Sequence, residues 1–165
     1  MPTPTPRPLP TLWPTGTPEP HTYSALHHYF RGHTLYKEGN LQQAIDQFSL
    51  AIAANLALYG SSFNALEWRA ALYNKLGYYE LAIKYLDRLV RQGPKIVRYY
   101  IRRGSVYLSL DQYQRAIQDY DKAIQLKPDV ALYYAKRAKS HRSLGQYTEA
   151  DADKAKACSL DSKYC

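Results

Sequence analysis

The chain has 165 residues, of which 45% are hydrophobic and 17 are tyrosine, and it carries a formal net charge of +8. No apolar stretch approaches the roughly 20 residues that a membrane-spanning helix needs, so we expect no spanning segment. Two cysteines are too few for a disulfide framework. The composition therefore excludes an integral membrane chain and a disulfide-rich mini-domain, and it is typical of a soluble protein.

Residues 1–22 differ in kind from the rest of the chain. Thr and Pro dominate residues 2–6 and 14–18, and this composition predicts a disordered spacer that forms neither a helix nor a packed core. No apolar run follows Met1, so the segment does not resemble a secretion signal. A proline-motif ligand for another protein is a competing interpretation of these residues.

The Pro-Thr runs are similar to tethers that join bacterial extracytoplasmic domains to a membrane anchor. This similarity favours an extracytoplasmic location, with a leader upstream of Met1 missing from the sequence. A cytoplasmic location is the alternative. The native sequence upstream of Met1 would decide between the two.

From residue 23 to residue 165 the sequence repeats itself with a constant step of 34 residues. Such a step predicts a tandem array that is stabilised by the stacking of neighbouring units. The predicted units are residues 25–58, 63–96, 97–130 and 131–164, and a turn-forming insertion within residues 56–62 lengthens the first step to 38. The clearest equivalences are Gly104, Tyr113, Ala116, Ala123 and Leu126 in one unit, and Ala138, Tyr147, Ala150, Ala157 and Leu160 in the next.

Each unit is predicted to form two amphipathic helices. In the third unit Tyr100, Gly104 and Tyr107 recur at steps of three and four residues, and the same spacing returns after a short turn at Asp111. Small residues at the Gly104 position let the two helices of a hairpin approach closely. Proline ends the second helix of the middle units because it lacks a backbone N–H.

Residues 144–150 read Leu-Gly-Gln-Tyr-Thr-Glu-Ala, and together with the small residue, the later Ala and the closing Pro they resemble the tetratricopeptide repeat. The resemblance covers residues 25–164. It implies an all-α fold, an α-solenoid of stacked helical hairpins wound into a right-handed superhelix. Departures are His28 in place of an early Trp, Leu or Tyr, and Leu56 and Ser162 in place of the closing Pro.

In that family the first helix of each unit lines a concave groove, and the family's groove positions can be carried over by register. They give a half that is rich in rings and a half that is basic, with no acidic residue at the positions selected in the basic half. The candidate site residues are Tyr29, Phe30, His33, Tyr36, Asn64, Trp68 and Asn74 from the first two units, and Arg98, Arg102, Lys136, Lys139 and Arg142 from the last two.

Five cations on one wall would attract carboxylates, and neighbouring rings could hold apolar side chains. We therefore expect a non-catalytic interaction scaffold that binds an extended peptide or protein segment, either acidic or with a free carboxy-terminus. The simpler alternative is that the lysines only solvate an exposed helix face. Binding of single-stranded nucleic acid is a less favoured alternative, and self-association of an otherwise monomeric chain is a third.

Some members of the family hold chaperone tails through a clamp of two Lys, two Asn and one Arg. In one register these places carry only two basic residues, and in the register shifted by one unit the clamp is again not reproduced. We therefore do not expect a chaperone adaptor of that kind. The residues at these places are Tyr29, His33, Trp68, Arg98 and Arg102, or Glu67, Ala71, Arg102, Leu132 and Lys136.

Catalytic and metal-binding patterns have little support in the sequence. His28 and His33 are five residues apart, which is not the i, i+4 spacing that places two ligands on one helix face. Phosphate-binding glycine loops, nucleophile elbows and paired groove carboxylates are missing from the sequence. We expect neither an enzyme, nor a cofactor, nor a metal site.

Three further expectations concern single positions. One arginine per unit, at Arg31, Arg69, Arg103 and Arg137, is predicted to lie along the seam between repeats with its head paired to a carboxylate or carbonyl. Asp151 and Lys154 replace residues that would face a following repeat, which is typical of a terminal unit. Cys158 and Cys165 are expected to be unpaired thiols, and a bridge between them would support an exported location.

Overall fold

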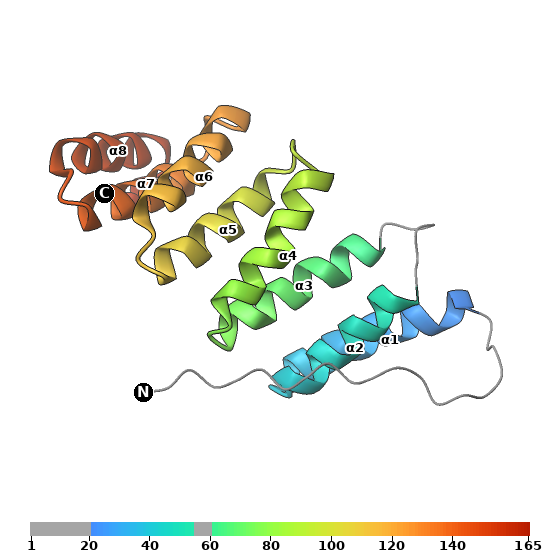
Figure 1. Cartoon of the computed structure of the whole chain (residues 1–165). Coiled ribbons are helices and arrows are strands. Elements are labelled where there is room, and N and C mark those ends of the chain that lie inside the picture. Colours follow the sequence, from blue (N-terminus) through green and yellow to red (C-terminus); the bar gives the residue numbers. More distant parts are fainter. Residues whose placement is uncertain (1–20, 55–60) are drawn as a thin grey trace, which may run out of the picture. The chain divides into compact units, whose positions relative to one another are not determined.

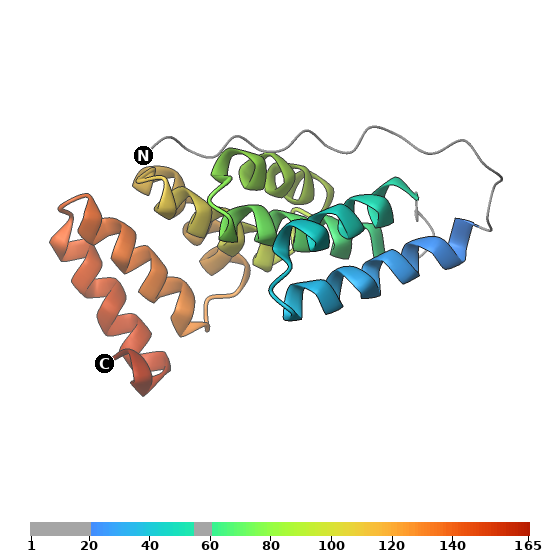
Figure 2. The ribbon, with the colours of Figure 1, turned by 90° about the horizontal axis from the view of Figure 1, so that it is seen from below.

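The computed structural model describes residues 21–54 and 61–165, with the side chains of residues 21–24, 26 and 61–64 left aside. These residues form helices joined by short turns and contain no strand, which confirms the all-α class (Figures 1 and 2). The elements are α1 (His21–Lys37), α2 (Leu41–Ala53), α3 (Ser61–Lys75), α4 (Tyr79–Gln92), α5 (Val97–Ser109), α6 (Tyr113–Leu126), α7 (Ala131–Ser143), α8 (Tyr147–Leu160) and the 3₁₀ turn η1 (Ser162–Tyr164).

The chain divides into two compact parts, Met1–Tyr85 and Leu86–Cys165. From here on we call these parts unit 1 and unit 2, and we call the four repeating segments repeats. In unit 1, α1 pairs with α2 and α2 packs against α3. In unit 2, α5 pairs with α6, α7 pairs with α8, and α6 packs against α7. The helix pairs α1–α2, α5–α6 and α7–α8 therefore form three of the predicted hairpins.

The turn inside each hairpin has the same backbone geometry in all four repeats. The second residue after the first helix has a positive φ, which is +82° at Gly39, +81° at Gly77, +57° at Asp111 and +75° at Gly145. In each turn the next N–H donates to a carbonyl five residues earlier, at 2.8–3.0 Å. This left-handed helix ending favours glycine, so Asp111 is the one strained position of the four.

The small residue of the first helix makes room for a ring of the second. A Cβ added at Gly32 would lie 2.9 Å from the ring of Phe48, and one added at Gly104 would lie 2.8 Å from the ring of Tyr120. Phe48 and Tyr120 are completely buried. The close approach therefore packs the first helix against a buried aromatic side chain of the second helix. The second helix also has a buried alanine, Ala116 in the third repeat.

The amino-terminal boundary differs slightly from the expectation. Helix α1 begins at His21, two residues inside the predicted spacer, because the last proline before Pro94 is Pro20 and nothing in residues 21 and 22 opposes a helix. The remainder of that spacer, residues 1–20, lies outside the described residues. Most of the predicted insertion at residues 56–62 does so too.

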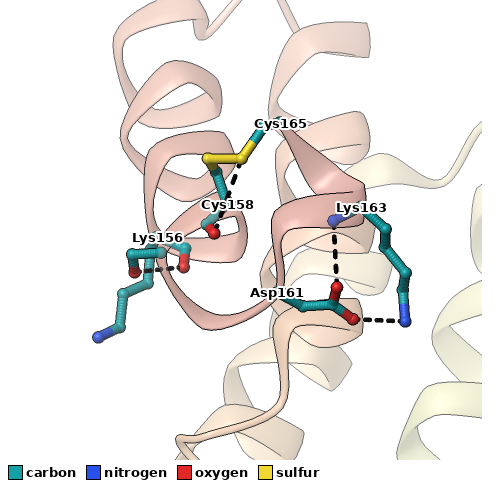
Figure 3. Close-up of a disulfide and its surroundings, with 6 residues drawn as sticks. Lys156, Cys158, Asp161, Lys163 and Cys165 are labelled. Carbon is teal, nitrogen blue, oxygen red and sulfur yellow. Dashed lines mark hydrogen bonds and ion pairs between the residues drawn. A yellow bond between two sulfur atoms is a disulfide. The ribbon is translucent and has the colours of Figure 1, made fainter.

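The expectation of two unpaired thiols is wrong, because Cys158 and Cys165 form a disulfide (Figure 3). After α8 the chain folds back through η1, where Asp161 accepts a hydrogen bond from the backbone N–H of Lys163 at 3.1 Å. The backbone N–H of Cys165 then donates to the carbonyl of Ser162 at 3.1 Å. These bonds bring the last residue back to α8, with the two Cα atoms 4.7 Å apart.

None of the helices in the described part of the chain combines the length and the apolar character that a membrane span requires.

Candidate binding surfaces

Aromatic side chains gather on α1, α2 and α3 of unit 1. The His33 ring centroid lies 4.4 Å from that of Trp68, 4.7 Å from that of Tyr29 and 5.5 Å from that of Phe48, while Tyr36 lies 5.2 Å from Trp68. Most of these contacts are edge-to-face, the arrangement that aromatic pairs prefer. We call these five residues the ring cluster.

Four members of the ring cluster were candidate site residues, and the structure brings them together. The fifth, Phe48, was not selected because it belongs to a second helix. Its signal in the sequence is its place opposite Gly32, where the smallest residue leaves room for a ring. Phe48 is buried, whereas the other four members are half-buried. The cluster therefore has a packed base and a partly accessible side.

Cations flank the ring cluster. The Lys75 ammonium lies 5.0 Å from the centroid of the Tyr36 ring, within the range of a cation–π contact. Burial lowers the pKa of His33, and the positive charge of Lys37 lowers that pKa further. His33 is therefore held in its neutral form at a lower pH than a free histidine.

The structure does not bring the other candidates of unit 1 into the ring cluster as a group. Phe30 is 60% exposed and lines a separate hollow of about 400 Å³ together with Arg31, Leu35 and others. The side chain of Asn64 lies outside the described residues. Asn74 is partly buried, and its Oδ1 has no hydrogen-bond partner among the described residues.

Cationic side chains occupy the first helices of unit 2. Arg98 and Arg102 lie on α5 and Lys136 and Lys139 on α7, and we call these four residues the basic wall. Lys136 links the two helices, because its ammonium donates to the Ser105 hydroxyl at 3.1 Å. Together α5 and α7 contain seven Lys or Arg residues and no Asp or Glu.

The basic wall is exposed except for Lys136, which is half-buried. Burial lowers the pKa of Lys136, and the neighbouring charge of Lys139 lowers that pKa further. Burial penalises the charged ammonium, and the nearby charge of Lys139 adds an excess of positive charge around it. A carboxylate placed beside Lys136 would relieve that excess.

Arg142, the last candidate of α7, differs from the basic wall in its surroundings. Its guanidinium forms an ion pair with Asp151 of α8 at 2.9 Å, and both side chains are exposed. Arg142 and Lys139 also line a hollow between α7 and α8. The structure thus places Arg142 at the edge of the α7–α8 hairpin.

The carboxylates of the second helices are engaged by the seam arginines. Arg103 forms two hydrogen bonds to Asp119, at 2.7 and 2.9 Å, and a third to Asp87 at 2.7 Å. Arg137 repeats the arrangement 34 residues later, with Asp153 and Asp121. These pairs raise the pKa of both guanidinium groups, since hydrogen bonds to carboxylates favour the charged form. The predicted seam arginines are confirmed in unit 2.

In unit 1 the same position finds other partners. Arg69 lies 4.0 Å from the centroid of the Tyr85 ring and donates to the Ser49 hydroxyl at 3.0 Å. It thus bridges α2 and α4, as expected of a seam residue, through a ring and a hydroxyl. For Arg31 the expectation is wrong, because no described helix precedes α1 to form a seam, and Arg31 is exposed.

Within the described residues, no group of three or more His, Cys, Asp or Glu side chains is placed to hold a metal ion.

Comparison with known protein families shows to which family the chain belongs. Two models described as tetratricopeptide repeat match it, one over residues 29–95 and one over residues 97–130. The chain belongs to the tetratricopeptide repeat family. A search of curated proteins gives no significant match. The fold is that of protein-interaction scaffolds, with about four repeats in eight described helices.

Solved tetratricopeptide structures have the same fold at low sequence identity. A crystal structure of MamA is 22% identical, with a TM-score of 0.75, covering 87% of this chain and 75% of the other. A MamA fragment, 41-end, from Desulfovibrio magneticus RS-1 is also 22% identical, with a TM-score of 0.77 and coverages of 86% and 78%. YrrB, described as having an unusual peptide-binding site, is 17% identical, with a TM-score of 0.73 and coverages of 84% and 69%.

Proposed function

We propose that this protein is a non-catalytic scaffold that binds an acidic peptide or protein segment on the basic wall of unit 2. The observation that carries the proposal is the segregation of charge in that unit. Its first helices, α5 and α7, have no carboxylate, while Asp119 and Asp153 on the second helices pair with the seam arginines. An acidic partner would supply the negative charge that α5 and α7 lack.

The chemistry of the basic wall suits carboxylates. Guanidinium groups such as those of Arg98 and Arg102 can form two parallel hydrogen bonds to one carboxylate. The half-buried ammonium of Lys136 would form a stronger contact than an exposed lysine, because less water competes for it. A free carboxy-terminus or a run of Asp and Glu would both satisfy these groups.

We propose that the ring cluster of unit 1 contacts apolar side chains of the partner. Tyr29, Tyr36 and Trp68 are half-buried, so each keeps an accessible ring surface. The edge-to-face packing around His33 holds these rings in place before any partner binds. Preorganised aromatic side chains lose little conformational freedom on binding and are common anchors at interfaces.

The proposal is tested with a fluorescent acidic peptide that contains Glu, Leu and a free carboxy-terminus, titrated into the full chain and followed by anisotropy. The variant Arg98→Glu/Arg102→Glu is expected to weaken binding by at least about tenfold. The matched control is Lys95→Glu/Lys127→Glu, which makes the same change in net charge at two exposed residues outside α5 and α7. Equal losses of affinity in both variants would show that binding depends only on net charge, and this result would contradict the proposal.

A single-stranded oligonucleotide in the same assay distinguishes nucleic-acid binding from peptide binding. Oligonucleotide binding would be nearly independent of sequence and would weaken steeply with salt, because phosphate contacts release counterions. Peptide binding that also uses apolar contacts would keep much of its affinity at raised salt, and Trp68→Ala would remove that part. Tighter binding of the oligonucleotide than of the peptide, with a steep loss at raised salt, would favour the alternative.

We also propose an extracytoplasmic location, which the disulfide between Cys158 and Cys165 supports because disulfides persist in oxidising compartments. The measurement is thiol alkylation of the protein in its native cells without reductant. Protected thiols are expected. Full alkylation of both cysteines would instead indicate a reducing compartment.

A further inference from the structure

The α7–α8 hairpin carries a second surface, distinct from the α5 face of the basic wall. It is an open hollow of about 240 Å³. Its floor is formed by small apolar residues, among them Ala135, Ala138 and Ala150, and cations stand at its edge, namely Lys139, Arg142 and Lys154. These three cations are exposed.

The internal repeat shows what kind of ligand such a hollow fits. The equivalent residues 34 positions earlier, including Gly104, Ser105 and Tyr120, belong to α5 and α6, and α7 packs against that pair of helices. α7 packs closely against these helices, because Lys136 of α7 donates a hydrogen bond to Ser105 at 3.1 Å and Tyr120 is completely buried. A surface of this shape therefore accommodates an α-helix. The alanine floor of the α7–α8 hollow would let a helix backbone approach closely.

The two equivalent surfaces differ in charge. We call the equivalent surface of α5 and α6, against which α7 packs, the inner surface. Lys139 occupies the position of Ser105 in the inner surface, and Lys154 occupies the position of Tyr120. Arg142 replaces a leucine at the third position and is partly neutralised by Asp151. Among the described residues that line the hollow there is no Asp or Glu. The hollow, which Tyr164 also lines, keeps small residues at Ala138, Ala150 and Ala157, where the α5–α6 surface has Gly104, Ala116 and Ala123, and it has gained cations.

We propose that this hollow binds an acidic amphipathic helix of a partner protein. The partner helix would place Ala or other small residues on the alanine floor and carboxylates against Lys139 and Lys154. Charge complementarity selects this occupant over a second copy of the chain. A second copy that offered α1, which contains Arg31 and Lys37 and no carboxylate, would bring like charges together.

The test uses a fluorescent synthetic helix, stapled to hold its conformation, with Ala and Tyr at the positions equivalent to the buried face of α7 and Glu elsewhere. Anisotropy is measured with the full chain. Lys154→Glu is expected to weaken binding by at least about tenfold, because it places a carboxylate at the edge of the hollow. Lys156→Glu is the matched control: it makes the same charge change on an exposed residue of α8 that does not line the hollow, and less than about a twofold change is expected.

A second variant tests the shape argument. Lys154→Tyr introduces the residue found at the equivalent position Tyr120 and is expected to reduce the preference for the Glu helix over its Gln counterpart while binding is retained, since Lys139 and Arg142 remain. Because Lys154 lies outside the basic wall, loss of peptide binding through Arg98 and Arg102 would not affect this result. Circular dichroism confirms that each variant is folded.

Four results would overturn the proposal. They are equal losses in Lys154→Glu and Lys156→Glu, equal affinity for a scrambled peptide of the same composition, no binding of the Glu helix, or a concentration-dependent oligomer that Lys154→Glu abolishes in sedimentation. The last result would assign the hollow to a second copy of this chain.

Discussion

Unit 1 and unit 2 use the same repeat register with different stabilising chemistry. Sixteen residues after Arg69 of unit 1 the sequence has Tyr85, whereas sixteen residues after Arg103 and Arg137 of unit 2 it has Asp119 and Asp153. Arg69 therefore stacks over Tyr85, whereas Arg103 forms two hydrogen bonds to Asp119. The comparison shows that the arginine occupies the same position in both repeats. The residue opposite it in the second helix decides which interaction it forms.

This difference also separates the binding surfaces. In unit 2 Asp119, Asp121 and Asp153 of α6 and α8 pair with Arg103 and Arg137, and α5 and α7 contain no Asp or Glu. In unit 1 aromatic contacts extend from the ring cluster to a second stack, in which Tyr73 and Tyr85 lie 5.6 Å apart. This difference is the basis of our proposal that unit 2 binds acidic segments and that unit 1 contacts apolar side chains.

The largest effect is expected from Asp119→Asn in unit 2. Asp119 is 3% exposed, and its removal would leave the Arg103 guanidinium partly buried beside a neutral amide. Breaking a buried ion pair from one side costs about 3 kcal/mol, which urea denaturation of the full chain would detect.

The matched control for that variant is Asp121→Asn. Asp121 pairs with Arg137 in the same ladder but its side chain is 51% exposed, so a loss of less than about 1 kcal/mol is expected. A loss as large as that of Asp119→Asn would show that burial does not decide the strength of these pairs.

A smaller effect is expected from Tyr85→Leu in unit 1. The substitution keeps an apolar side chain but removes the ring beneath Arg69 and the stack with Tyr73. The expected loss is about 1 kcal/mol in urea denaturation. Tyr79→Leu, in the same helix, is the control for loss of a tyrosine. An effect of Tyr85→Leu no larger than the control would mean that the stacking contributes nothing beyond packing.

The smallest expected effect is a pH dependence of unit 1. The pKa of His33 lies below its ordinary value of 6.5 in the folded chain, so between these two values the unfolded chain binds more protons. Stability should therefore fall as the pH drops below about 6.5, and His33→Gln should flatten this slope. Trp68 fluorescence in a Trp13→Phe background reports the unfolding. An unchanged slope in His33→Gln would assign the pH dependence to other groups.

The repeat register predicted most of the fold. It placed the turn of the third repeat at Asp111, and the equivalent residues Gly39, Gly77 and Gly145 form the other turns, because few residue types tolerate the left-handed backbone that closes a helix. It also placed the seam arginines, since a residue that recurs in every unit serves contacts that recur. These features depend on local sequence and on neighbouring repeats, both of which the sequence contains.

Features at the ends of the array were predicted less well. Phe30 and Arg31 lie on the face of α1 that lines the amino-terminal hollow, where a register derived from inner repeats does not apply. The disulfide depends on how η1 turns the last residues back toward α8, and a spacing of seven residues does not determine that turn. The role of Phe48 in the ring cluster also required the packing between helices to be known.

The central claim, that an acidic segment binds to the first helices of unit 2, is tested most directly by hydrogen exchange of the full chain with and without the acidic peptide. Slower exchange is expected in α5 and α7 at saturating peptide, with α6 unchanged. The Arg98→Glu/Arg102→Glu variant should show no slowing at the same peptide concentration. Unchanged exchange in α5 and α7 of the wild-type chain, or slowing confined to α6, would contradict the claim.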